Sequence, residues 1–428
     1  MKLSEIINKK IAIWGFGVEG QATAKYLSEK NISFTVLCKD TESVDKYMCE
    51  TAKVDTDLLN KFDVIIKSPG ISPYSKIVKY TTAQLTSPTA IWFANEKNTT
   101  VIAVTGTKGK STTVSLLAHV LKKSGKNVNL VGNIGQALIS STSNYDYIVL
   151  EASSFQIYDG NIQADVVLVN NLSAEHVDWH QGAANYFKDK LKILAQAKIK
   201  IINAKNQQLN KLVNDESVHY FNIDNGFYVH KEALMFKDKQ ILCLADVQLM
   251  GTHNLENIGA ALCVCLHLGV DIDTCINAVK SFKPLAHRLQ NLGKIGQHYA
   301  INDSIATTPV ATLAAMKTVD LSKTTLLVGG YDRGNDWTEF AEAINKNPPD
   351  LLLVSGQNAE AITNHLVHIK AQFAFKLCEN LPDAINYAKL NSPTNHTILL
   401  SPGAPSFDQF DSYIKRGEFF HLELNKNV

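Results

Sequence analysis

The segment VTGTKGKSTT at residues 104–113 constrains the fold more than any other part of the sequence. It follows a β-branched, apolar run at Thr99–Thr105, which predicts a buried parallel strand, and it leads into a helical pattern at Ser111–Lys123. Loop N–H groups and the start of a helix together favour an anion. The usual spacing G-x-x-x-x-G-K-[ST] would require glycine where Val104 stands, so we predict a shortened phosphate loop. The alternative is a tight strand-to-helix turn with incidental lysines.

Charge and hydropathy exclude several classes of protein. Lysine and arginine number 42 against 41 aspartates and glutamates, a balance that predicts no general attraction to nucleic acid. No apolar run reaches the roughly 18–20 residues of a membrane helix, and the N-terminus resembles no signal peptide, so we expect a cytoplasmic protein without membrane insertion. The 7 cysteines include no C-x-x-C pair, and we expect them to be mostly buried free thiols.

The alternation of strand and helix patterns predicts an α/β fold with three domains, at residues 1–94, 95–284 and 285–428. The first and third domains are predicted to be Rossmann-like, and the central one to be a phosphate-loop domain with a parallel sheet. Phe221–Gln248 is predicted to form β-hairpins, and helices are expected at Asn254–Leu268 and Ile272–Ser281. The other predicted strands are Lys10–Trp14, Ser33–Cys38, Asp63–Lys67, Tyr147–Leu150, Val166–Val169, Ile199–Ile202, Tyr299–Asn302, Thr324–Gly329, Leu351–Val354 and Thr397–Leu400.

The first domain carries Gly15-x-Gly17-x-x-Gly20 directly after its first strand. Alone, this fingerprint would suggest a nicotinamide dinucleotide. A ribose-binding acidic residue is then expected about 20 residues later, and Cys38-Lys39-Asp40 supplies it only ambiguously. An oxidoreductase would also leave the phosphate loop unexplained.

Several motifs resemble those of the Mur ligase family, whose members build the peptide stem of bacterial peptidoglycan. The shortened loop TGTxGKS is one of them, and the others occur in the family's order. They are Glu151-Ala152-Ser153-Ser154-Phe155-Gln156, Asn170-Asn171-Leu172-x-x-Glu175-His176-x-Asp178, Tyr186-x-x-x-Lys190-x-x-Ile193, Gly251-x-His253-Asn254-x-x-Asn257 and His287-Arg288. The glycine fingerprint, the Ser68-Pro69-Gly70 turn and the C-terminal SPGAPSFDQF are similar to those of glutamate-adding members.

The resemblance implies an N-terminal UDP-sugar domain, a central ATP domain and a C-terminal glutamate domain. It implies a monomeric ligase that joins glutamate to UDP-N-acetylmuramoyl-L-alanine through an acyl phosphate, at the expense of ATP. Two Mg²⁺ ions and a carbamylated Lys190 are the implied cofactors. A folylpolyglutamate-synthetase-like ligase and a non-catalytic UDP-sugar or nucleotide sensor are the competing hypotheses.

The resemblance also implies roles for individual residues. Catalytic and metal-binding roles fall on Lys110, Ser111, Glu151, His176 and Lys190. The implied ATP contacts are Gly106, Thr107, Lys108, Gly109, Lys110, Ser111, Thr112, Asn257, Arg288 and Asp303. The implied UDP-substrate contacts are Gly15, Gly17, Val18, Glu19, Gly20, Ser68, Pro69, Gly70, Asn133, Ser153 and Gln156, and the implied glutamate contacts are Thr307, Arg333, Ser406 and Tyr413.

The sequence departs from the common family pattern at a few positions. Ile305 replaces a lysine, Lys108 stands where asparagine is common, and Glu175 replaces an aspartate. A variant of the family adds L-glutamate rather than D-glutamate, and WGFGVEG, TKGKST and NDSIATTP look closer to that variant. The chirality of the glutamate stays open at this point.

Overall fold

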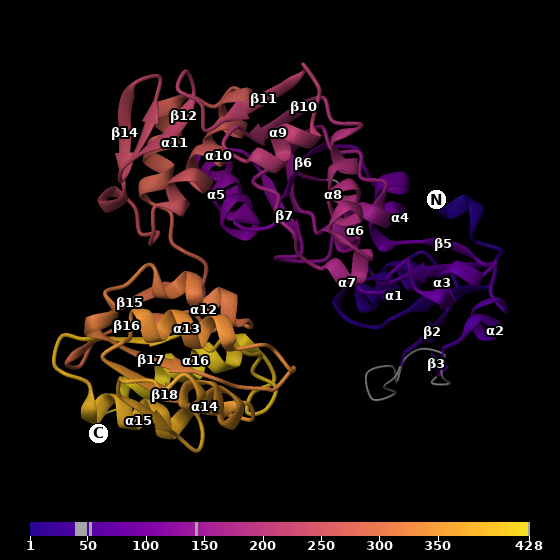
Figure 1. Ribbon diagram of the computed structural model, residues 1–428. Coiled ribbons are helices and arrows are strands. Elements are labelled where there is room, and N and C mark those ends of the chain that lie inside the picture. The colour runs from indigo at the N-terminus through magenta and orange to yellow at the C-terminus, as the bar shows by residue number, and fades with distance from the viewer. Residues whose placement is uncertain (39–48, 51–53, 142–143, 427–428) are drawn as a thin grey trace. The chain divides into compact units, whose positions relative to one another are not determined.

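The computed structural model describes residues 1–38, 49–50, 54–141 and 144–426 (Figure 1). The chain divides into two compact units. The first unit contains Met1–Val247 and Thr252–Phe282, and the second contains Gln248–Gly251 and Lys283–Val428. The first unit holds the sheets of both the predicted first and second domains, so the boundary near residue 94 stays a prediction.

The N-terminal sheet consists of parallel strands in the order β3-β2-β1-β4-β5. A tight turn joins β1 to α1, and a Cβ on Gly20 would lie 2.2 Å from the carbonyl oxygen of Gly15, which explains the third glycine of the fingerprint. Lys39 and Asp40, named above for a nicotinamide site, lie outside the described residues. The elements are β1 (Ile11–Trp14), α1 (Val18–Glu29), β2 (Thr35–Leu37), β3 (Cys49–Glu50), α2 (Thr56–Leu59), β4 (Val64–Lys67), α3 (Lys76–Tyr80), β5 (Gln84–Thr86) and α4 (Pro88–Asn95).

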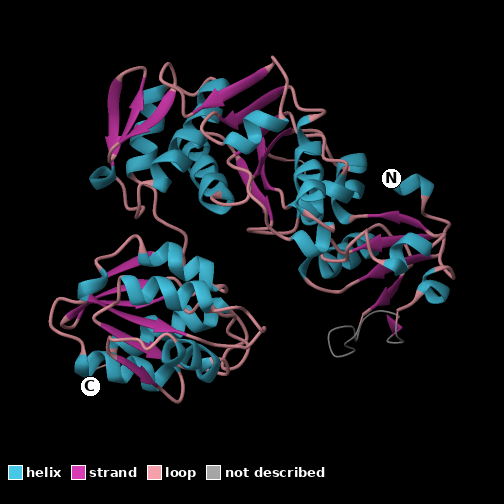
Figure 2. Ribbon diagram, viewed as in Figure 1, coloured by secondary structure: helices cyan, strands magenta, loops and turns pink. Residues whose placement is uncertain are grey.

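The central sheet is also parallel, in the order β11-β10-β9-β6-β8-β7. Its central strands β6, β8 and β9 are largely apolar and buried, as predicted for the strand before the phosphate loop, and helices cover both faces of the sheet (Figure 2). The elements are β6 (Thr100–Thr105), α5 (Lys110–Lys123), β7 (Val128–Gly132), β8 (Tyr147–Glu151), α6 (Ser154–Gly160), β9 (Val166–Val169), α7 (Val177–His180), α8 (Ala183–Leu191), β10 (Ile199–Asn203), α9 (Gln207–Leu212) and β11 (Val218–Phe221).

A small antiparallel sheet follows, with strands β12 (Phe227–His230), β13 (Ala233–Phe236) and β14 (Lys239–Cys243). The predicted hairpins are therefore confirmed. Helix α10 (His253–His267) packs against α5 and against β12 and β13, and α11 (Ile272–Lys280) also packs on α5. The helix that begins at the phosphate loop is thus supported along its length.

The second unit contains one sheet in the order β15-β16-β20-β17-β18-β19. Within this sheet, β15 and β16 pair antiparallel and the other described pairs are parallel, so the carboxyl ends of β16, β17 and β20 lie at one edge. The elements are β15 (Gln290–Ile295), β16 (His298–Asn302), α12 (Pro309–Met316), β17 (Thr324–Val328), α13 (Thr338–Lys346), β18 (Leu351–Val354), α14 (Ala359–His368), β19 (Phe375–Leu377), α15 (Leu381–Asn391), β20 (Thr397–Leu400) and α16 (Tyr413–Asn425).

The sequence expectations agree with the structure for the cysteines and fall short for some strands. Among the cysteines whose side chains are described, all are free and most are buried, while Cys38 and Cys243 are partly exposed. The short strands β3, β5, β7, β11, β15 and β19 were not predicted, because each mixes polar with apolar residues. No helix in the described part of the chain is both long and apolar enough to cross a membrane.

Candidate active site

The loop between β6 and α5 has the geometry of a phosphate loop. Gly109 precedes the first residue of α5 with φ 81°, and a Cβ there would lie 2.3 Å from Oδ1 of Asn257. Gly106 has φ 149°, and a Cβ there would lie 3.0 Å from Cβ of Asn170. Both glycines are therefore required by their backbone conformation and by close neighbours. Asn257, predicted to contact ATP, is buried behind this loop.

The side chain of Asn171 fixes the loop from the end of β9. Its Oδ1 accepts hydrogen bonds from the backbone N–H groups of Thr107, at 3.1 Å, and Lys108, at 2.8 Å. Its Nδ2 donates to the carbonyl oxygen of Lys108 at 3.0 Å. The hydroxyl of Thr107 lies 3.0 Å from that of Tyr186. The sequence assigned no role to Asn171 or Tyr186, although both stand in recognised motifs.

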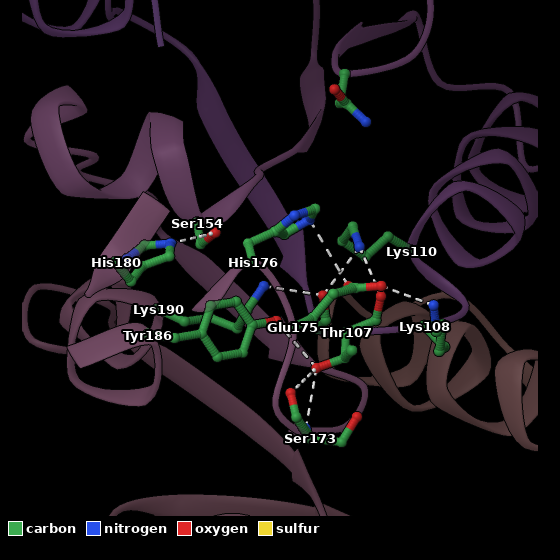
Figure 3. A network of polar contacts seen from close by, with 12 residues as sticks. Thr107, Lys108, Lys110, Ser154, Ser173, Glu175, His176, His180, Tyr186 and Lys190 are labelled. Carbon is green, nitrogen blue, oxygen red and sulfur yellow. Dashed lines mark hydrogen bonds and ion pairs between the residues drawn. The ribbon is translucent and has the colours of Figure 1, made fainter. Parts of the chain in front are cut away.

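Two lysine ammonium groups are directed at the same loop, as Figure 3 shows. Lys110 donates to the carbonyl oxygens of Gly106 and Thr107, each at 2.9 Å. Lys190, from α8, is 2% exposed and donates to the same Gly106 oxygen at 2.9 Å. Burial, with the nearby charge of Lys110, lowers the pKa of Lys190 to about 7. This amine is therefore partly neutral, and so nucleophilic, near neutral pH.

Glu151 lies at the carboxyl end of β8 and is 1% exposed. Its Oε1 accepts a hydrogen bond from Nδ2 of Asn133 at 3.2 Å, whereas its Oε2 is buried without a partner among the described residues. A buried carboxylate oxygen of this kind is suited to a hard cation. The residues named for Mg²⁺ therefore fit such an ion at this atom.

His176 has a left-handed backbone, φ 52°, and a half-exposed side chain. The centroid of its ring lies 4.9 Å from that of Phe155. Burial lowers the pKa of His176, so the imidazole is neutral at pH 7 and can bind a cation. No group of three or more His, Cys, Asp or Glu side chains that could hold a metal occurs within the described residues. A metal here would need other donors, such as the Ser111 hydroxyl, a modified lysine or phosphate oxygens.

Two departures from the family pattern form an ion pair with each other. The Nζ of Lys108 lies 2.7 Å from Oε1 of Glu175 (Figure 3). Burial would raise the pKa of Glu175, but the hydrogen bond and charge of Lys108 outweigh it and lower that pKa. The extra positive charge on the loop is thus balanced locally by Glu175.

The predicted UDP-substrate residues of the first unit come together from both of its parallel sheets. A Cβ on Gly15 would lie 2.8 Å from Cβ of Ser68, so the glycine loop touches the Ser68-Pro69-Gly70 turn. Gln156, held by Ser153 in a capping box at the start of α6, donates to Oε1 of Glu19 at 2.5 Å. Both sets of residues therefore lie along one boundary between the sheets.

A largely buried ion pair crosses the same boundary. Lys67, at the end of β4 and 1% exposed, lies 2.5 Å from Oδ2 of Asp159 in α6. The Lys67 ammonium also donates to the carbonyl oxygen of Ile71 at 2.7 Å. The pair therefore joins the two sheets next to the Ser68-Pro69-Gly70 turn.

The second unit gathers its predicted residues at the carboxyl ends of β16, β17 and β20. Ser406 is 2% exposed, and its Oγ has no partner among the described residues. The guanidinium carbon of Arg333 lies 5.9 Å from the ring centre of Phe407. The carbonyl oxygen of Tyr413 accepts from the Ser304 hydroxyl at 2.8 Å, while Thr307 precedes α12. These residues share one edge of the sheet with Asp303, and Arg288 lies in the segment before β15.

Arg416 was not predicted, yet it organises this edge. It is 3% exposed and donates to Ser304 Oγ at 3.0 Å and to three carbonyl oxygens, those of Ser304, Ala404 and Pro405. Burial lowers the pKa of Arg416 to about 10. One side chain therefore ties the loop after β16 to the loop after β20.

The chain is similar to known proteins both in sequence and in fold. Residues 104–265 match the Mur ligase middle domain. The chain is 36% identical to a UDP-N-acetylmuramoyl-L-alanine–L-glutamate ligase from Xanthomonas euvesicatoria, over 98% of this chain and 96% of that protein. It is 33% identical to a UDP-N-acetylmuramoylalanine–D-glutamate ligase from Francisella tularensis, over 96% and 94%. The crystal structure of a UDP-N-acetylmuramate-alanine ligase from Thermotoga maritima superposes with a TM-score of 0.66 at 17% identity, covering 97% of this chain and 99% of that one.

Proposed function

The chain belongs to the Mur ligase family, ATP-dependent enzymes that form amide bonds, and we propose that it joins L-glutamate to UDP-N-acetylmuramoyl-L-alanine in peptidoglycan precursor synthesis. The observation that carries the proposal is the pair of lysines, Lys110 and Lys190, converging on the Gly106 carbonyl beside the phosphate loop. A sensor that only binds nucleotide has no need of a second, buried lysine at that place.

In the proposed reaction, the substrate carboxylate attacks the γ-phosphorus of ATP, and ADP leaves. The glutamate amine then attacks the resulting acyl phosphate, and phosphate leaves as the amide forms. Loop N–H groups and Lys110 hold the phosphates and offset their negative charge where the carboxylate approaches. Asp303 would accept a hydrogen bond from the ATP ribose.

Magnesium ions would be held by Ser111, Glu151, His176 and a carbamylated Lys190. When bound, they neutralise charge on the phosphoryl group and on the carboxylate that attacks it. Two features support the carbamate. The lowered pKa of Lys190 leaves a neutral amine that can add to CO₂ with loss of a proton. Glu151, whose Oε2 has no partner among the described residues, is the one carboxylate among the residues named for the metal, and a carbamate would add a second anionic ligand.

The glutamate contacts would come from the second unit. Arg333 presents a planar fork of donors suited to a carboxylate, and the Oγ of Ser406 supplies a buried hydroxyl with no internal partner among the described residues. The alternative is that Arg333 only braces its loop. Among the described residues no ion pair joins it to Asp332 or Asp336, whose carboxylates accept backbone N–H groups of Gly334 and Thr338 instead.

The choice of L-glutamate rests on the relatives and on sequence departures. The Xanthomonas protein is slightly more similar than the Francisella one, and Ile305 removes a lysine common in the family. Release of ADP should be measured with the UDP substrate and each glutamate enantiomer, and the product digested to identify its terminal residue. Turnover with D-glutamate alone would overturn the stereochemistry, and no turnover with either enantiomer would overturn the proposed function.

A further inference from the structure

A buried carboxylate next to Lys190 has no role in the reaction described above. Asp189 is 1% exposed and accepts three hydrogen bonds. Its Oδ2 accepts from the hydroxyl of Tyr74 at 2.8 Å and lies 2.9 Å from Nδ1 of His180, and its Oδ1 accepts from Nζ of Lys192 at 2.8 Å. Side chains from three separate segments therefore meet at the residue that precedes the lysine.

The carboxylate also sets the orientation of His180. This imidazole is fully buried, and its Nε2 lies 3.0 Å from Oγ of Ser154 (Figure 3). When the Nδ1–H group of His180 donates a hydrogen bond to Asp189, the unprotonated Nε2 can accept a hydrogen bond from the Ser154 hydroxyl. The Ser–His–Asp order resembles that of a hydrolase, but Ser154 is only 2% exposed in the first turn of α6 and cannot meet a substrate. The three residues serve to join elements rather than to act as a nucleophile.

Tyr74 brings in the segment that follows the Ser68-Pro69-Gly70 turn. Trp179 and Gln181 bind the same segment at further points. The Ser72 hydroxyl donates to the carbonyl oxygen of Trp179 at 2.6 Å, Nε1 of Trp179 donates to that of Gly70 at 3.0 Å, and Nε2 of Gln181 donates to that of Tyr74 at 3.1 Å. The turn proposed to hold the UDP substrate is therefore bonded to the helices α7 and α8.

We propose that Asp189 and His180 are positioning residues that hold the helix carrying Lys190 against residues 70–74, so that the lysine and the UDP-substrate turn are fixed relative to each other. The inference rests on the role of Lys190 in the proposed function. A lysine amine stands at the end of a flexible four-carbon stem, so its placement depends on its backbone being fixed. Supporting residues of this kind typically change activity or metal affinity by about 10- to 100-fold when replaced.

The first test removes a single hydroxyl. Tyr74→Phe deletes the bond to Asp189, and Tyr26→Phe is a matched control, because the Tyr26 hydroxyl donates to Oε1 of Glu96 at a similar 2.7 Å in the same unit. We expect Tyr74→Phe to lower kcat roughly 2- to 10-fold, with the KM for ATP and glutamate nearly unchanged, and Tyr26→Phe to leave kcat unchanged. Equal kcat values for the two variants would overturn the proposal.

The second test detects the carbamate of Lys190 directly. With ¹³C-bicarbonate and no nucleotide, carbon NMR should show a carbamate signal in the parent protein that is absent from Lys190→Ala. Asp189→Asn should reduce the fraction of carbamate at a given bicarbonate concentration, and Tyr26→Phe should not. An undiminished signal in Asp189→Asn, with parental kcat, would contradict the positioning role.

The third test separates positioning from a general loss of stability. Asp189→Asn should lower kcat about 10- to 100-fold in the parent, but cause no further loss in Lys190→Ala assayed with added acetate, because no lysine remains to be positioned. Equal losses in both backgrounds would mean that Asp189 is merely structural. Full activity of Lys190→Ala without acetate would instead overturn the proposed role of Lys190 itself, so the two failures are distinguishable.

Discussion

Asp303 allows a direct test of how the burial of one carboxyl group changes the stability of the second unit with pH. The residue is 5% exposed, and burial raises the pKa of its carboxyl group to about 6, although the Ser401 hydroxyl and the Leu289 N–H both donate to it. In an unfolded chain the pKa would be about 3.9. Between these two values the native protein holds a proton that the unfolded chain has released.

Stability should therefore fall as pH rises from about 4 to about 6, and stay level above that range for this group. The difference of about 2 pH units corresponds to roughly 3 kcal/mol in the free energy of unfolding of the second unit. Asp303→Asn carries no titrating group, so its stability relative to the parent should rise by up to that amount between pH 4 and pH 7.5. ATP affinity should fall in the same variant if the side chain holds the ribose.

Hydrogen exchange of peptides that cover β16 and β20 would report the stability of this unit in the full-length chain. Asp411→Asn, which changes an exposed aspartate of the same unit, is the matched control and should follow the parent at every pH. Parallel pH profiles for Asp303→Asn and the parent would refute the reasoning, because they would show that the carboxyl group is ionised in the native state at no cost.

Three further predictions each concern the replacement of one positively charged side chain. Lys110→Ala should abolish turnover while calorimetry shows nearly unchanged binding of the UDP substrate, and an equal loss of that binding would contradict the separate placement of the two sites. Arg333→Lys should raise the KM for the preferred glutamate enantiomer but not for ATP, since it keeps the charge and loses the fork; unchanged kinetics in Arg333→Ala would place the pocket elsewhere. Arg416→Met should destabilise the second unit by about 3–5 kcal/mol in thermal unfolding, because four buried oxygens each lose a donor and the Pro405 oxygen keeps only the Tyr331 N–H, and a change below 1 kcal/mol would refute this.

The sequence was sufficient to predict the elements on which the candidate site depends. A β-branched strand, two glycines and a helix identified the phosphate loop, because each of these signals is local. The hairpins before α10 and the central, largely apolar strands of the three large sheets followed from the same kind of pattern, whereas short strands such as β5, β7, β11 and β19 did not. The ends of elements shifted by a residue, as at α5, which begins at Lys110 rather than Ser111.

Contacts between distant segments could not be predicted in the same way. The bond between Asp189 and Tyr74 spans 115 residues, and that between Arg416 and Ser304 spans 112. Neither residue has a local neighbour that indicates its partner, so only the folded chain identifies the pair. The Lys108–Glu175 ion pair is similar. In the sequence each residue is an isolated departure from the family pattern, and only the structure shows that Nζ of Lys108 lies 2.7 Å from Oε1 of Glu175.

The largely buried pair of Lys67 and Asp159 has a consequence for how related chains can diverge. Replacing either residue alone leaves its partner's charge buried and unpaired, which typically costs about 3–5 kcal/mol, whereas replacing both with apolar side chains of similar volume is often neutral. That loss is a large fraction of the roughly 5–15 kcal/mol by which native proteins are stable. The two positions should therefore be inherited as a unit: lineages that lose the charge at one should have lost it at the other, and chimaeras that exchange only one of the two sheets between such lineages should fold poorly.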